Sequence, residues 1–496
     1  MNTKKIISAV CAFTLASAAL ISCGSAGYYG GHYGGVMSDS NGFPPKGLED
    51  YQTTDIVERN FVSPAIAPES YFSLDRNTAS YSYMRRIIGE GRRVSEGSVR
   101  LEEYINYFSY DYVRPTEGAA LATTCNLFDC PWNEDHMLLS IGVAAEEVEY
   151  SSKPNNIVFL IDTSGSMYGD DRLGLIQQSF SMLTESLNAN DTISIVTYAG
   201  DSRVALRGES GSNKTKICNI LQDLEASGST NGQGGIQKAY DLAQEFYSAD
   251  ANNRVILATD GDFNVGASSQ SELKKLISQK RERGIYLSVL GVGMYNTNDK
   301  TMKTLAENGN GNYAYLDSVA EARKVLIEEL GGTFNVVAKD AKMGVTFNEK
   351  TVEKYRLLGY ESKMMSQEEF DDDKKDAGEI GSGHTVTALY EIELKQDASG
   401  GVAMCEVRFK SPDTDESKSI SATVMTDDYT DVPGEDSVFI GCVAEYGLIL
   451  RQSKYKGNAD IHNVVTRLSA LDCTKESVNG FRAEFLEIAK KAEKLY

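Results

Sequence analysis

The sequence predicts an α/β fold: a doubly wound, mostly parallel sheet combined with an antiparallel β-sandwich and with helical segments at both ends. Three observations predict it. Strand-like and helix-like segments alternate over 154–334, which is typical of a parallel sheet covered by helices on both faces. Alternating and β-branched runs follow over 335–427. Two amphipathic helical patterns close the chain. The length of 496 residues allows roughly three domains.

Composition excludes several classes of protein. Hydrophobic residues make up 41% and charged residues 24% of the chain, so it is neither disordered nor polytopic in a membrane. The net charge of −22 would repel phosphate backbones, so we expect no nucleic-acid partner. With four His and no Cys-x-x-Cys pair, a zinc centre is not expected.

Residues 1–22 have the pattern of an export signal. Lys4 and Lys5 precede an apolar run, 6–21, which is short for a membrane-spanning helix. Leu20-Ile21-Ser22-Cys23 resembles the lipobox of bacterial lipoproteins, a family in which lipid is attached to the cysteine. The resemblance implies a membrane anchor on Cys23. The alternative is an ordinary secretory signal with a chance cysteine.

The segment 23–47 is rich in Gly, Tyr and Ser, and we expect a flexible tether. In lipoproteins of two-membrane bacteria, an Asp after the cysteine often signals retention in the inner membrane. Gly24 and Ser25 stand there, so the resemblance favours a lipid-anchored protein of the bacterial cell envelope, at the outer membrane.

Six cysteines follow Cys23, and an exported chain meets conditions in which disulfides persist. Cys125 and Cys130 are close enough in sequence to close a small loop, so they form a possible disulfide. The alternative is that both are buried free thiols. The sequence does not choose among the pairings.

Two regions precede the one in which strands and helices alternate, 154–334. In the N-terminal segment, 48–115, an irregular stretch and a polar segment at 71–81 lead to predicted helices at 78–89 and 99–108. The region 116–153 has strand patterns at 120–124 and 137–143. We expect these two strands to pair with the β-sandwich, which would make the α/β domain an insertion.

The α/β domain, 154–334, begins with a continuous apolar strand, which fits burial on both faces. Its predicted strands are 157–161, 192–198, 203–206, 255–258, 285–292 and 313–316. Its predicted helices are 173–187, 216–224, 236–247, 272–283, 300–308 and 319–330.

The β-sandwich, 335–430, is predicted from strands at 336–347, 352–360, 384–394, 402–410 and 417–426. The C-terminal segment, 431–496, has amphipathic helices at 437–451 and 481–495.

The first strand of the α/β domain ends in a group of oxygen-bearing side chains. Asp162, Ser164 and Ser166 follow it at alternate positions. Ligands of open parallel sheets lie beyond the carboxyl ends of the strands. One carboxylate and two hydroxyls are an all-oxygen set that suits a hard cation such as Mg²⁺. Thr230 precedes a helix, and Asp260 ends a second buried strand, so both can converge on the same edge.

These residues, with the Thr259-Asp260-Gly261 turn, resemble a von Willebrand factor type A (VWA) domain with its metal-ion-dependent adhesion site. The resemblance implies one bound ion, Mg²⁺ or else Mn²⁺ or Ca²⁺. Ser164, Ser166 and Thr230 would contact it through hydroxyls. Asp162 and Asp260 would act directly or through water. In the family, the remaining coordination position usually takes an Asp or Glu of a partner protein.

The resemblance extends over nearly everything after residue 60, to a bacterial family of exported type A domain proteins whose role is poorly defined. It is carried by Ser80-Tyr81, Arg85-Arg86, Glu102-Glu103-Tyr104-Ile105-Asn106-Tyr107-Phe108, Pro131-Trp132-Asn133, Tyr355-Arg356-Leu357-Leu358-Gly359-Tyr360-Glu361, Asp376-Ala377-Gly378-Glu379-Ile380-Gly381-Ser382-Gly383-His384 and Glu445-Tyr446-Gly447-Leu448-Ile449-Leu450-Arg451.

The sequence therefore predicts a lipid-anchored envelope module that binds an acidic side chain of a partner protein through a metal ion. One alternative is an envelope scaffold with metal-independent contacts. A metal-dependent hydrolase is a weaker alternative, because no nucleophile–base motif is present. We expect His384 to be structural, Asp262 to be a solvated loop carboxylate, and 371–373 to be a solvated acidic run.

Overall fold

The computed structural model describes residues 56–74, 76–148, 153–261, 267–293, 299–329, 335–412, 414, 416–475 and 480–496. The predicted signal, the tether with Cys23, and Asp262 lie outside the described residues. All described residues belong to one unit, 48–496. In this part of the chain, no helix is both long enough and apolar enough to cross a membrane.

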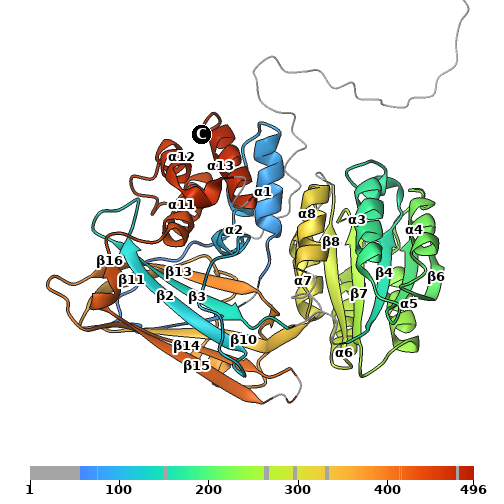
Figure 1. Cartoon of the computed structure of the whole chain (residues 1–496), viewed down its shortest axis with the longest axis horizontal. Helices are drawn as coiled ribbons and strands as arrows, with labels where there is room; N and C mark the ends of the chain where they lie inside the picture. The colour runs from blue at the N-terminus through green and yellow to red at the C-terminus, as the bar shows by residue number, and fades with distance from the viewer. Residues whose placement is uncertain are drawn as a thin grey trace, which may run out of the picture. The chain divides into compact units, whose positions relative to one another are not determined.

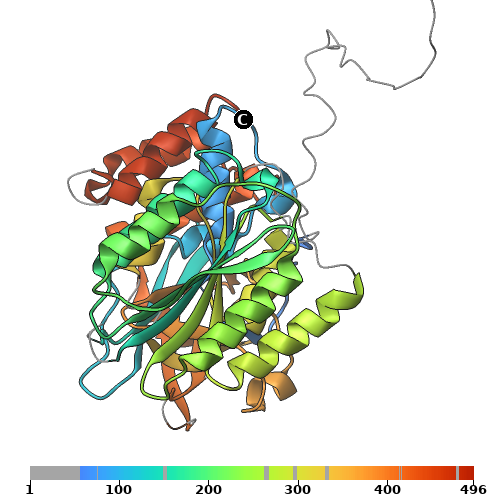
Figure 2. The ribbon, with the colours of Figure 1, turned by 90° about the vertical axis from the view of Figure 1, so that its right-hand side faces the viewer.

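A six-stranded sheet with helices on both faces forms the α/β domain (Figures 1 and 2). Its strand order is β6-β5-β4-β7-β8-β9, and every neighbouring pair is parallel except β5 and the edge strand β6. The strands are β4 (Asn155–Asp162), β5 (Thr192–Tyr198), β6 (Ser202–Ser210), β7 (Asn252–Thr259), β8 (Ile285–Gly291) and β9 (Tyr313–Tyr315).

Alternate side chains of β4 enter two different cores, as expected of a strand that is buried on both faces. Ile157, Phe159 and Ile161 pack with α3 (Leu173–Ser186), α4 (Lys214–Gln222) and α8 (Val319–Arg323). Val158 and Leu160 face α5 (Gly232–Glu245), α6 (Ala267–Arg281) and α7 (Asp299–Asn308). A continuous apolar run can therefore be buried along its whole length.

Two sheets form the β-sandwich, and all their neighbouring strands are antiparallel except β2 and β16. One has the order β1-β10-β14-β15, with β12 paired to β10, and the other has the order β11-β13-β3-β2-β16. Their strands are β1 (Glu69–Ser73), β2 (Leu121–Asp129), β3 (Met137–Ala145), β10 (Val336–Phe347), β11 (Val352–Leu358), β12 (Gly378–Gly381), β13 (Thr385–Leu394), β14 (Gly401–Lys410), β15 (Ser417–Met425) and β16 (Tyr429–Thr430).

Strands from before and after the α/β domain share the second sheet. β3 pairs with β13 along its length, with Ile141 opposite Ala388, and β2 pairs with β3. The chain leaves the sandwich after β3 and returns to it in β10. The α/β domain is thus inserted into the sandwich.

Two N-terminal elements differ from the sequence-based expectation. The polar segment at 71–81 begins with strand β1, where Tyr71 lies opposite Gly344 of β10. The second helix is only α2 (Leu101–Ile105). It ends there because the Asn106 side chain docks on the sandwich, accepting from the Thr387 amide at 2.7 Å and donating to the Tyr360 hydroxyl at 3.0 Å. Both features depend on tertiary contacts.

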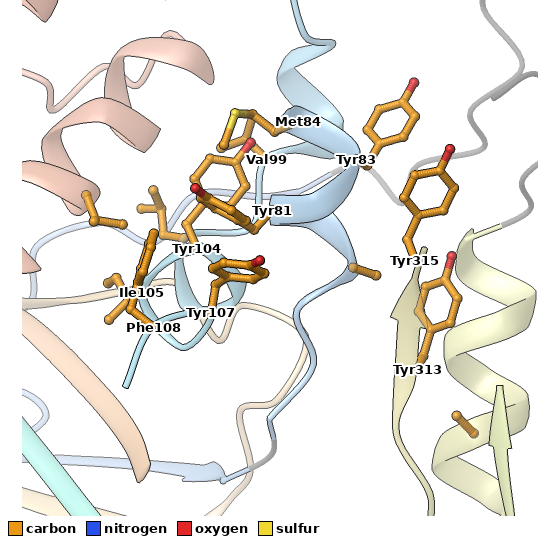
Figure 3. Close-up of a cluster of buried hydrophobic side chains, with 14 of the residues drawn as sticks. Tyr81, Tyr83, Met84, Val99, Tyr104, Ile105, Tyr107, Phe108, Tyr313 and Tyr315 are labelled. Atoms are coloured by element: carbon orange, nitrogen blue, oxygen red, sulfur yellow. The ribbon is translucent and has the colours of Figure 1, made fainter. Parts of the chain in front are cut away.

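A helical layer covers one side of the sandwich and contacts the α/β domain (Figure 1). It consists of α1 (Ala79–Gly89), α2, α11 (Glu435–Leu450), α12 (Ile461–Ala470) and α13 (Gly480–Ala492). Tyr81 stacks on Tyr107 with ring centroids 3.9 Å apart, and Tyr83 meets Tyr315 of β9 edge-on at 5.9 Å (Figure 3). These aromatic side chains are packing residues.

The possible Cys125–Cys130 disulfide is not formed, because both thiols are free. Cys125 lies in β2 and packs against the sandwich core, whereas Cys130 belongs to the cluster of the helical layer. Five residues of extended chain span roughly 16 Å, far beyond the Cα separation that a disulfide allows.

Candidate metal centre

Two carboxylates lie side by side because of strand order. β4 and β7 are adjacent and parallel, with Ile161 opposite Ala258, and both strands end at the same edge of the sheet. Asp162 is the last residue of β4, and Asp260 directly follows β7. Their side chains are fully buried or nearly so, with exposed fractions of 0% and 1%.

Hydrogen bonds orient the Asp162 carboxylate. The Ser164 amide donates to Oδ1 at 2.9 Å, and the Thr259 hydroxyl donates to Oδ2 at 3.1 Å. The Gly261 amide in turn donates to the Thr259 hydroxyl at 3.2 Å. The turn after β7 is thereby joined to the end of β4. Thr259 belongs to the motif seen in the sequence, but its hydroxyl bond to Asp162 could not be predicted from that motif.

The two serine hydroxyls of the Asp-x-Ser-x-Ser loop face one another. Ser164 Oγ and Ser166 Oγ lie 3.1 Å apart, and Ser164 is buried. A short 3₁₀ turn, Gly165–Met167, follows Ser164, and the buried Met167 side chain fixes it to the core. The loop therefore presents two hydroxyls on one side, beside the Asp162 carboxylate.

The loop that carries Thr230 is bonded to the Asp-x-Ser-x-Ser loop. The Ser227 amide donates to the Thr163 carbonyl at 2.8 Å, and the Gly165 amide donates to the Gly228 carbonyl at 3.0 Å. Asn231 then caps α5. Thr230, which is half-buried, is held between these two attachments. The structure thus gathers the loops of all five predicted residues at one edge of the sheet.

Electrostatics at this edge favour a cation. Burial raises the pKa of Asp162, the hydrogen bonds from Ser164 lower it and the neighbouring Asp260 carboxylate raises it, and together these effects bring it to about 6. Burial and the Asp162 carboxylate also raise the pKa of Tyr198 well above its usual value. Two buried carboxylates that repel each other are stabilised by a positive charge between them.

The donor set fits a hard cation. Two carboxylates and three hydroxyls match the all-oxygen preference of Mg²⁺, Mn²⁺ and Ca²⁺. In the described part of the chain, no group of three or more His, Cys, Asp or Glu side chains is arranged so that it could hold a metal ion.

An ion pair links this edge to the helical layer, and sequence analysis missed it. Arg86 of α1 contacts Asp171, in the loop between the 3₁₀ turn and α3, at 2.8 Å. It also donates to the Tyr315 hydroxyl at 3.2 Å. No local pattern could reveal a pair 85 residues apart.

Other polar residues have structural partners. Burial, together with the nearby Arg76 guanidinium, lowers the pKa of His384 to about 3, so its imidazole is neutral near pH 7. Asp371 and Asp373 pair with Arg408 at 2.9 and 3.1 Å. The acidic run is therefore partly ion-paired. His136 lies 2.6 Å from Glu391, a contact that its sequence neighbours did not suggest.

Comparison with known proteins identifies the family. The uncharacterised protein YfbK of Escherichia coli (strain K12) is 38% identical over 453 residues, which cover 86% of this chain and 78% of YfbK. The chain belongs to the YfbK family. Its residues 332–401 and 393–495 match the C-terminal domain model of that family, and residues 156–330 match the von Willebrand factor type A domain model. Residues 46–140 match a further von Willebrand factor model.

More distant relatives share only part of this YfbK-family chain. Inter-alpha-trypsin inhibitor heavy chain H2 of Mus musculus is 26% identical over 166 residues, which span 17% of its own length. A solved von Willebrand factor type A structure from Catenulispora acidiphila covers 76% of this chain and 88% of its own, at 15% identity and a TM-score of 0.42. BatB from Bacteroides thetaiotaomicron aligns over 36% of this chain and 97% of its own, at 20% identity and a TM-score of 0.31.

Proposed function

We propose that this YfbK-family chain is a protein-binding module that uses one divalent cation, Mg²⁺ or a similar ion, to bind an Asp or Glu side chain of a partner. The ligands are Asp162, Ser164, Ser166, Thr230 and Asp260. Because hydroxyl ligands are neutral, they offset less of the ion's charge than carboxylates would, and an external carboxylate is attracted.

The observation that carries this proposal is the convergence of three loops around two buried carboxylates. Asp162 and Asp260 stand at the ends of adjacent strands. The Ser164 and Ser166 hydroxyls are 3.1 Å apart, and backbone hydrogen bonds hold the Thr230 loop against them. A hydrolase would also need a positioned nucleophile and base. The serines at this edge are assigned to the metal, and His384 lies in the sandwich.

Partner capture tests the proposal. Residues 24–496 would be immobilised and exposed to envelope extract in Mg²⁺ and in EDTA. Asp162→Asn in Mg²⁺ removes one ligand charge with little change in shape. Asp201→Asn is the matched control, because this carboxylate lies nearby, is 68% exposed and pairs with Arg203. We expect a partner that the wild type and the control retain in Mg²⁺. The same partner should be lost from the wild type in EDTA and from Asp162→Asn in Mg²⁺.

Equal capture in all four conditions would instead support the scaffold alternative, in which the sandwich and C-terminal helices make metal-independent contacts. A captured partner should then be scanned for the acidic residue it supplies. Its Asp→Asn or Glu→Gln variant should lose binding as fully as Asp162→Asn does.

Envelope localisation through lipid on Cys23 is part of the same proposal and is supported by the signal-like residues 1–23. Metabolic labelling with a palmitate analogue tests it. The full chain should be labelled and should sediment with outer membranes, and Cys23→Ser should abolish both. Labelling that persists in Cys23→Ser would contradict this assignment of the anchor.

A further inference from the structure

A groove of about 590 Å³ opens beside the candidate metal centre, at the carboxyl ends of β4 and β5. Its lining includes Thr163, which stands between two of the proposed metal ligands, and Ser227, which lies three residues before the ligand Thr230. The Ser227 amide donates to the Thr163 carbonyl at 2.8 Å. The groove and the metal centre therefore share a wall, and a partner chain that reaches the ion also passes the groove.

The groove is negatively charged. Its lining has the carboxylates of Asp201, Asp223 and Glu225 and the guanidinium of Arg203. Asp201 pairs with Arg203 at 3.2 Å, so these two charges offset each other. Asp223 and Glu225 are exposed and have no ion-pair partner among the residues that the structure describes. Their two negative charges are therefore left for whatever occupies the groove.

The end of helix α4 is an unfavourable place for these two carboxylates. The helix ends at Gln222, Asp223 is its C-cap, and its last turn has no basic residue. The carboxyl end of a helix carries partial negative charge, so cations stabilise it and carboxylates destabilise it. Positions at which a sequence works against its own local structure are expected at functional sites. This placement points to a positive group from outside the chain at the end of α4.

A large aromatic side chain near the metal centre is left in water. Tyr168 lies two residues beyond the proposed ligand Ser166 and is 80% exposed. Tyr is enriched in protein-binding surfaces, where the partner buries its ring. Its exposure supports a protein partner, rather than a small ligand, at this edge of the sheet.

We propose that the groove receives a Lys or Arg side chain of the same partner segment that supplies the acidic ligand to the metal ion. This inference rests on the function proposed above. Four residues of extended chain span roughly 13 Å, so the cation should lie within about four positions of the carboxylate. Asp223 and Glu225 would repel a segment with only acidic residues, and the groove thus selects against it.

A second metal ion fits the groove less well than a basic side chain does. In the described residues, no three or more His, Cys, Asp or Glu side chains are grouped so that they could hold an ion, and the groove's carboxylates are no exception. A Lys or Arg side chain needs no such geometry, because its N–H groups pair with one or two carboxylates.

Nine-residue peptides test the spacing directly. Each peptide has a central Asp in a Gly-Ser background and one Lys at a position from −4 to +4, and matched series carry Gln or Glu in place of Lys. Binding of the full chain to dense arrays of these peptides, which make weak contacts measurable, would be compared in Mg²⁺ and in EDTA. We expect binding that EDTA abolishes. At one or more positions, Lys should raise the apparent affinity at least tenfold over Gln, and Glu should lower it.

Variants assign the effect to the groove. Asp223→Asn/Glu225→Gln should reduce the advantage of Lys over Gln to less than about twofold. It should leave the Mn²⁺ affinity unchanged within twofold and the thermal unfolding midpoint no lower than that of the wild type, because neither side chain is a proposed ligand and both oppose the helix dipole. Asp250→Asn is the matched control, since this carboxylate is exposed but precedes β7, at the amino ends of the strands. It should keep the full advantage of Lys.

EDTA and Mn²⁺ counting separate the ways in which the proposal can fail. Binding that persists in EDTA, or no binding of any peptide, would contradict the metal-dependent function and the proposed role of the groove together. Binding that EDTA abolishes but that is equal for Lys and Gln peptides would overturn the role of the groove alone. So would an advantage of Lys that persists in Asp223→Asn/Glu225→Gln. Two Mn²⁺ ions per wild-type chain and one per double-variant chain would assign the groove to a second metal ion instead.

Discussion

Arg86 of helix α1 donates to Asp171 at 2.8 Å, and Asp171 lies five residues beyond Ser166 in the loop that leaves the candidate metal centre. The N-terminal helix, which packs on the C-terminal helices, is thereby attached to the loop that supplies two of the proposed metal ligands. The contact is half-buried, with exposed fractions of 14% for Arg86 and 45% for Asp171. It is therefore a direct physical link between the helical layer and the metal centre.

We predict that Arg86→Ala weakens Mn²⁺ binding by about two- to fivefold, the modest effect expected of a partly exposed ion pair. Arg92→Ala is the control, because Arg92 lies in the same helical region, pairs with its neighbour Glu90 at 3.2 Å and is 34% exposed. Fluorescence or EPR titration gives the affinity. A double-mutant cycle with Asp171→Asn should show coupling. Fully additive effects would contradict the link.

The neighbouring Arg85 has a larger, structural role. It contacts Asp317 at 2.5 Å, Glu321 at 2.8 Å and Glu484 of α13 at 2.9 Å, and its side chain is 5% exposed. Arg85→Met would leave the fully buried Glu321 without this cation. We predict a loss of about 3–5 kcal/mol in the free energy of unfolding, measured by urea denaturation. Arg92→Met should lose less than about 0.5 kcal/mol. A comparable loss in both variants would contradict this account.

His384 should make the protein sensitive to mild acid. Burial and the Arg76 guanidinium lower its pKa to about 3, whereas in the unfolded chain it is about 6.5. The unfolded state therefore takes up the proton first as the pH falls. The stabilisation by neutral His384 is complete above about pH 6.5 and is lost progressively towards pH 3. Between pH 7 and pH 5 the loss is about 2 kcal/mol.

Denaturation of His384→Gln at pH 7 and pH 5 tests this prediction. The variant should lose about 2 kcal/mol less than the wild type over that interval, because Gln does not titrate. His462→Gln, at a side chain that is 74% exposed, should behave as the wild type does. Equal losses in the wild type and in His384→Gln would show that His384 does not carry the effect.

The fold class could be predicted because the spacing of apolar residues along the sequence indicates which faces of each strand and helix are buried. Residues 157–161 of β4 form a continuous apolar run that is buried on both faces, and strand and helix patterns alternate after it, as in a parallel sheet covered by helices. Strand β1 could not be predicted. The strand has only five residues and lies beside polar neighbours, so it is a strand only because it pairs with β10.

In the candidate site, too, some features could be predicted from local sequence and others depend on tertiary contacts. Four of the five predicted ligands end or follow a strand, Thr230 precedes α5, and strand order alone brings Asp162 beside Asp260. The Thr259 hydroxyl bond to Asp162 and the Arg86–Asp171 pair depend on side-chain geometry across 97 and 85 residues, so no local pattern encodes them.

Metal-dependent stability tests the central claim most directly. Unfolding of the wild type and of Asp162→Asn would be measured in EDTA and in Mg²⁺, with Asp201→Asn as control. The wild type and the control should gain about 2.7 kcal/mol when Mg²⁺ is a hundredfold above its dissociation constant. Asp162→Asn should gain nothing, yet be at least as stable as the wild type in EDTA, because it removes a charge that burial and the neighbouring Asp260 carboxylate disfavour. An equal gain in Asp162→Asn, or none in the wild type, would contradict a metal centre at this edge of the sheet.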